Sequence, residues 1–78
     1  MREYLATFYT HYGAACFARS LKEQGVPHRM MPVPRRLSSS CGVCVVFSWE
    51  GTPPADAEDL EAVYRTEHET YTPVYRGE

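Results

Sequence analysis

A continuous apolar run over residues 43–49 constrains the fold of this chain more than any other feature. The run, Val-Cys-Val-Val-Phe-Ser-Trp, is rich in β-branched and aromatic side chains and contains no charge. A strand of this kind has apolar side chains on both faces, so it needs cover on both sides or a place at the centre of a sheet. The sequence therefore predicts a sheet built around residues 43–49.

The length of the chain limits how many such cores it can hold. With 78 residues, there is room for one small hydrophobic core, because a second would need roughly another 50 residues. Apolar residues make up 44% of the chain and charged residues 23%, which is typical of a packed domain. We therefore expect one domain over residues 1–78.

Local patterns predict the other elements. Residues 4–9 form an aromatic, β-rich run that predicts a first strand. Residues 11–24 carry apolar side chains at helical spacing, with Thr10 as a suitable N-cap and Gly25 after the last turn, and predict a helix.

Two weaker strands and a second helix complete the predicted order. Residues 28–33 and 71–76 each contain a proline that cannot donate to a sheet, so both strands should lie at edges. Residues 55–66 combine helical apolar spacing with acidic first turns and predict a second helix. The order strand, helix, strand, strand, helix, strand predicts an α+β fold, a ferredoxin-like βαββαβ plait with both helices on one face of an antiparallel sheet.

Charge and cysteine content exclude several classes of function. The net charge of −2 and pI near 5.9 argue against a nucleic-acid partner, which needs a basic surface. No apolar run approaches the ~20 residues that span a bilayer, and the N-terminus has a strand pattern, so we expect no membrane association and a cytoplasmic location. Three cysteines, an odd number, favour free thiols in a reducing compartment.

The histidines and cysteines do not have the spacing of a zinc site. Three histidines, His11, His28 and His68, are scattered, and only Cys41 and Cys44 are close together in sequence. We predict no resident metal and no cofactor.

The loop over residues 34–42 carries the residues best suited to chemistry. Its candidate site residues are Arg35, Arg36, Ser39, Ser40, Cys41 and Gly42. A reactive cysteine works as the thiolate, which needs positive potential, hydrogen-bond donors and access. Cys41 has arginines five and six residues earlier, serine hydroxyls before it and a glycine after it. The alternative is that Cys41 is only a small residue in a tight turn.

The other two cysteines fit structural positions better. Cys41 and Cys44 form a CxxC sequence, but an apolar strand follows it instead of the helix that activates this motif in thioredoxins. Residues three apart in a strand point to opposite faces, so a disulfide would require local bending. We interpret Cys44 as a buried strand residue, with a second reactive thiol as the alternative, and Cys16 as a small apolar residue of the helix.

Three segments together resemble one known family. They are residues 4–8, residues 21–26 and, above all, the sequence Pro-Val-Pro-Arg-Arg-Leu-Ser-Ser-Ser-Cys-Gly over residues 32–42. They resemble the small bacterial domains described as putative selenium/sulfur carrier protein-like, over almost the whole chain. The resemblance implies a cytosolic carrier whose loop cysteine, here Cys41, holds sulfur or selenium as a persulfide or selenopersulfide. Its implied partners are a donor, such as a pyridoxal-phosphate cysteine desulfurase, and an acceptor enzyme.

Two residues depart from the pattern of that family. Cys44 stands where an ordinary apolar residue is expected, which keeps a two-cysteine redox mechanism open. Arg36 stands where an acidic residue is common, which would raise the positive potential of the loop. Under the carrier hypothesis both Arg35 and Arg36 stabilise the thiolate of Cys41.

Two other functions compete with a carrier, which is not strictly an enzyme. One is a non-catalytic regulatory module that binds a small ligand or pairs with a second copy of the chain through its edge strands. The other is thiol redox chemistry or the binding of a soft metal ion such as Cu(I) through Cys41 and Cys44.

Overall fold

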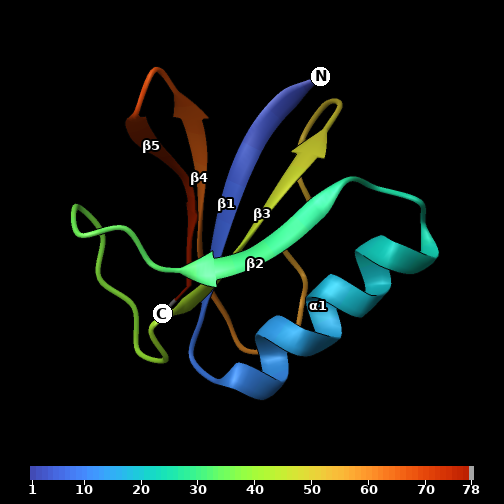
Figure 1. Ribbon diagram of the computed structural model, residues 1–78, viewed down its shortest axis with the longest axis horizontal. Helices are drawn as coiled ribbons and strands as arrows, with labels where there is room; N and C mark the ends of the chain where they lie inside the picture. Colours follow the sequence, from blue (N-terminus) through green and yellow to red (C-terminus); the bar gives the residue numbers. More distant parts are fainter. Residues whose placement is uncertain (78) are drawn as a thin grey trace.

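One antiparallel sheet and one helix make up the described part of the chain. The computed structural model in Figure 1 describes residues 1–77. The sheet has five strands in the order β2-β3-β1-β4-β5, and α1 packs against one face of it. The elements are β1 (Arg2–Phe8), α1 (His11–Glu23), β2 (His28–Pro32), β3 (Val43–Trp49), β4 (Leu60–Glu67) and β5 (Thr70–Arg76).

The predicted two-helix ferredoxin-like plait is wrong. Residues 55–66, predicted as a second helix, instead form a loop and most of β4, which pairs with β1 on one side and β5 on the other. A strand in this position is buried on both faces, with Val63 on the side of α1 and Tyr64 on the opposite side. The same apolar residues also fit one stripe of a helix, so periodicity alone could not distinguish the two.

The remaining elements follow their local signals. In α1, the Thr10 hydroxyl accepts a hydrogen bond from the Gly13 N–H at 3.0 Å, and Gly25 with φ 73° follows the last turn, as the predicted caps require. The prediction that residues 43–49 form an interior strand is confirmed, because β3 pairs with both β2 and β1. The two strands that contain Pro32 and Pro73 lie at the edges of the sheet, also as predicted.

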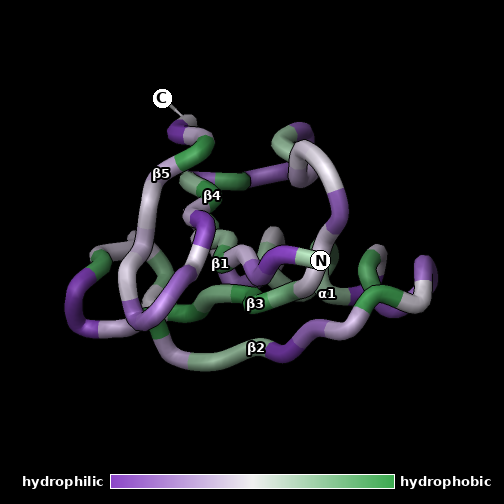
Figure 2. Tube along the Cα trace, turned by 90° about the horizontal axis from the view of Figure 1, so that it is seen from above, coloured by the Kyte–Doolittle hydropathy of each residue, from purple (hydrophilic) through white to green (hydrophobic). Residues whose placement is uncertain are grey.

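Apolar clusters cover both faces of the sheet. The cluster beneath α1 contains Tyr4, Ala6, Phe8, Ala14, Phe17, Leu21, Val45, Phe47, Leu60 and Val63. The cluster on the opposite face contains Leu5, Cys44, Val46, Ala62 and Tyr64, and Leu37 from the loop before β3 packs against it. Figure 2 shows apolar residues in green along β3 and α1. β3 is therefore covered by a helix on one side and partly by a loop on the other.

The turn between β4 and β5 has a strained backbone. His68 and Glu69 have φ values of 49° and 64°, so both lie in the left-handed region. Two-residue hairpin turns of this shape favour Asn-Gly, because a residue with a bulkier side chain costs about 1–3 kcal/mol there. His68 and Glu69, two titratable residues, thus occupy a backbone conformation that Asn and Gly adopt at a lower cost.

Candidate functional site

The loop over residues 33–42 is fastened to the end of the sheet. The Ser39 hydroxyl donates to the Phe8 carbonyl at the end of β1, at 3.2 Å. The N–H and the hydroxyl of Ser40 both donate to the Glu61 carboxylate at the start of β4, at 3.3 and 3.2 Å. Two of the predicted site residues therefore fix the loop to neighbouring strands.

Glu61 is a site residue that the sequence pattern did not reveal. In the pairing of β1 with β4, Thr7 faces Ala62 and Phe8 faces Leu60, so Glu61 is the extra residue of a β-bulge. A bulge changes the direction in which a side chain points, and here the Glu61 carboxylate reaches the loop. Only the register between the two strands could have indicated this contact.

Cys41 lies near the end of this loop. Its side chain is half-buried against the cluster beneath α1, and its thiol donates to the Val43 carbonyl at 3.4 Å. Gly42 follows with φ 76°, and its carbonyl accepts a hydrogen bond from the Val33 N–H at 3.1 Å. This bond joins the two ends of the loop, so the backbone on both sides of Cys41 is held in place.

Replacing Gly42 should loosen this arrangement. Gly42→Ala is expected to lower the free energy of unfolding by about 1–2 kcal/mol, because a side chain disfavours positive φ. No heavy atom lies within 4 Å of an added Cβ, so the cost comes from the backbone and not from a clash. Urea unfolding measures the loss. Gly42→Asn, which tolerates this conformation better, should cost less, and equal stability of Gly42→Ala and the wild type would contradict the expectation.

The two arginines of the loop lie beside the hairpin of β4 and β5. Arg36 Nη1 donates to the Glu69 carbonyl in the strained turn, at 2.7 Å. Arg35 is exposed and makes no hydrogen bond or ion pair within residues 1–77. Both line a cavity of about 370 Å³ together with Pro34, Glu69 and Tyr71. Their support of a thiolate at Cys41 stays a prediction.

Cys44 lies on the opposite face of the sheet from Cys41. Its side chain is fully buried, and its thiol is 3.8 Å from the Pro32 carbonyl. Burial raises the pKa of Cys44 to about 11, with a further rise from Cys41 and an opposing attraction from Arg29. Cys44 is thus a protonated thiol at neutral pH, buried in a strand as the sequence pattern predicts.

The third cysteine lies on α1. Cys16 is half-buried, and its hydrogen bond with Tyr12 raises the pKa of the Tyr12 phenol. All three cysteines are free thiols. Within residues 1–77, no three His, Cys, Asp or Glu side chains gather in a way that could hold a metal ion. The single helix found in that range is neither long nor apolar enough to cross a membrane.

The fold and the loop together define a class of protein. It is a small antiparallel sheet with one packed helix, which holds a cysteine in a hydrogen-bonded loop at one end of the sheet. The chain belongs to the family described as "Putative Se/S carrier protein-like", whose model matches residues 3–76, and the resemblance found in the sequence is thereby confirmed. A search of curated proteins and a search of solved structures found no significant match.

Proposed function

We propose that this protein carries sulfur or selenium on Cys41, as a persulfide or selenopersulfide, between a donor and an acceptor protein. The observation that carries the proposal is the family match over residues 3–76, which includes the whole of the loop around Cys41. The difference between the two neighbouring thiols supports the choice of residue. Cys41 is partly accessible, whereas Cys44 is fully buried.

Loading is a thiol exchange that needs no external oxidant. The Cys41 thiolate attacks the outer sulfur of a persulfide on the donor. A bond forms between Cys41 Sγ and that sulfur, the sulfur–sulfur bond of the donor breaks, and the donor cysteine leaves as a thiolate. Delivery repeats the same displacement, with a thiolate of the acceptor as the attacking group.

The other loop residues have two proposed tasks. Ser39, Ser40 and Gly42 hold the backbone around Cys41, and their hydrogen bonds to β1, β4 and residue 33 support this positioning role. Arg35 and Arg36 contribute positive potential at the loop, which favours a thiolate or an ionised persulfide. Arg35 has no partner within residues 1–77, so its charge is available to an incoming protein.

The test is sulfur loading from a cysteine desulfurase supplied with L-cysteine. Intact mass measurement should show one reductant-labile sulfur on the wild type and on Cys16→Ser, and none on Cys41→Ser. Cys16→Ser is the matched control, because Cys16 is also free and half-buried. Loading of Cys41→Ser to the wild-type level would refute the proposal. Equal loss of sulfur loading in Cys44→Ser, with a fold that circular dichroism shows to be intact, would instead indicate a two-cysteine mechanism.

A further inference from the structure

A second cavity opens on the sheet face opposite α1, between β2 and the turn that joins β4 to β5. Its volume is about 140 Å³. Its apolar walls are Leu5, Met31, Val46 and Tyr71, and its polar walls are Arg29, Thr66, Glu67, His68 and Glu69. Sites for drug-sized molecules start at roughly 300 Å³, so this cavity suits a smaller molecule.

Two groups of opposite charge face this cavity without pairing. Arg29 on β2 is the cross-strand partner of Val46, which places its side chain on the cavity face, and its attraction to the buried Cys44 agrees with that position. Glu69, in the turn between β4 and β5, lines this cavity as well as the one beside Arg35 and Arg36. Neither charged group forms an ion pair within residues 1–77.

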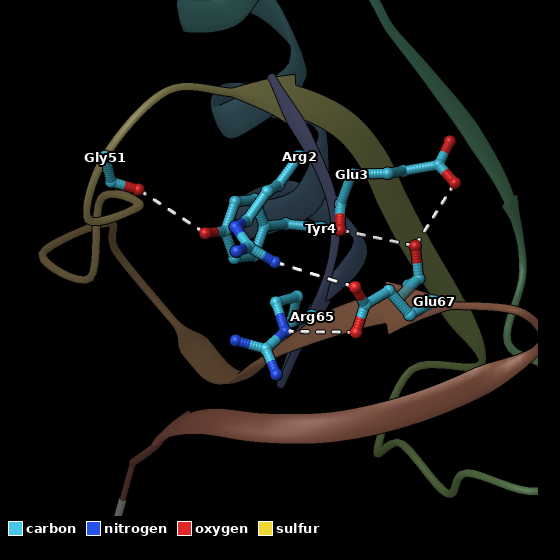
Figure 3. Close-up of polar contacts among 7 residues, drawn as sticks. Arg2, Glu3, Tyr4, Gly51, Arg65 and Glu67 are labelled. Carbon is cyan, nitrogen blue, oxygen red and sulfur yellow. Dashed lines mark hydrogen bonds and ion pairs between the residues drawn. The ribbon is translucent and has the colours of Figure 1, made fainter.

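The second acidic side chain of the rim is already neutralised. The Glu67 carboxylate lies 3.7 Å from the Arg2 guanidinium and 3.8 Å from that of Arg65. Figure 3 marks both ion pairs with dashed lines. Of the arginine and glutamate side chains that line the cavity, Arg29 and Glu69 are the two without an ion pair in the described part of the chain. A ligand with one charge of each sign matches this pair.

The backbone of the turn gives an independent reason to assign a ligand here. His68 and Glu69 both have positive φ, although an Asn-Gly pair would fit the turn with less strain. Strained residues of this kind are concentrated at binding sites, where the position of a side chain matters more than its cost in stability. The strain is located at the residues that form the charged rim of the cavity.

We propose that this cavity binds a small α-amino acid with an apolar side chain. The carboxylate of the ligand pairs with the Arg29 guanidinium, which suits the planar geometry of a carboxylate, and the ammonium pairs with Glu69. The side chain of the ligand rests on Leu5, Met31 and Val46. This binding is separate from the carrier function and does not involve Cys41.

Calorimetric titration with L-norvaline tests the proposal on the intact chain. N-acetyl-L-norvaline lacks the ammonium and L-norvalinamide lacks the carboxylate, so each should bind about tenfold more weakly or worse, the usual size of a lost charged hydrogen bond. Arg29→Gln and Glu69→Gln should each weaken the binding of L-norvaline to a similar degree. Arg19→Gln, an exposed arginine on α1, and Arg35→Gln, in the neighbouring cavity, should leave binding unchanged.

Several outcomes would overturn the assignment. One is the absence of saturable binding at millimolar L-norvaline. Another is binding of the two blocked analogues as tight as that of L-norvaline. The third is loss of binding in Arg35→Gln but not in Arg29→Gln. The fold of each variant is checked by its far-ultraviolet circular dichroism spectrum. Cys41→Ser, which should abolish sulfur loading, should bind L-norvaline normally, so failure of the carrier proposal and failure of this one are distinguishable.

Discussion

Phe47→Ala should lower the free energy of unfolding by about 3–5 kcal/mol, the usual cost of removing a buried aromatic ring. Phe47 is 1% exposed and lies in β3 at the centre of the cluster beneath α1. Its ring contacts those of Tyr4, Phe17 and Trp49, with centroid distances of 5.8, 5.3 and 6.2 Å. Total stabilities run at about 0.05–0.15 kcal/mol per residue, so for a chain this short the loss is a large share of the whole.

Urea unfolding followed by tryptophan fluorescence measures this loss. Val74→Ala is a suitable control, because Val74 on β5 is 45% exposed and its truncation should change the stability by less than about 0.5 kcal/mol. A loss below about 1 kcal/mol for Phe47→Ala would mean that the cluster beneath α1 repacks around the missing ring.

The free energy of unfolding should also fall steeply between about pH 9 and pH 11. Burial raises the pKa of Cys44 from 9.0 to about 11, so in this window the folded chain keeps a proton that the unfolded chain releases. The contribution of the neutral thiol is fully present below the unfolded pKa and is lost as pH rises through the folded pKa. At about 1.4 kcal/mol per pKa unit, the loss from this one group is about 2–3 kcal/mol.

A comparison of variants isolates this effect from other titrations. Cys44→Ala removes the buried thiol, so the stability difference between Cys44→Ala and the wild type should change by about 2–3 kcal/mol between pH 8 and pH 11, in favour of the variant at high pH. Cys16→Ser keeps the thiol of Cys44 and should follow the wild-type slope. Parallel curves for Cys44→Ala and the wild type would show that Cys44 does not ionise differently in the two states.

The elements that could be predicted from sequence are those defined by local signals. The caps at Thr10 and Gly25 determine the ends of α1, and the run over residues 43–49 has too many apolar side chains for any place but a covered strand. The helix predicted around Leu60–Tyr64 was wrong because the same sequence of apolar residues fits one stripe of a helix and a strand buried on both faces. The conformation of this segment is decided by pairing with β1, which is distant in sequence, and with β5, the next strand of the hairpin.

Some features of the candidate site could likewise be predicted from local sequence, and others could not. Cys41 and its loop could be identified from composition and from the resemblance to a family, because both depend on adjacent residues. The contact between Ser40 and Glu61 depends on a bulge in the pairing of β1 with β4, and the contact between Arg36 and Glu69 joins residues 33 positions apart. Contacts of this kind arise from strand register and chain path, which no local pattern contains.

Cys41 and Cys44 pack on opposite faces of the sheet, and under the proposed function this placement affects the lifetime of a persulfide on Cys41. A protein persulfide is lost when a neighbouring thiol attacks its inner sulfur, closes an internal disulfide and releases the outer sulfur as hydrosulfide. Burial opposes this reaction, because Cys44 is fully buried in β3 and packs on the face opposite the one that Cys41 packs against. Under the proposed function, a persulfide on Cys41 would therefore be discharged by encounters with other molecules and not by Cys44.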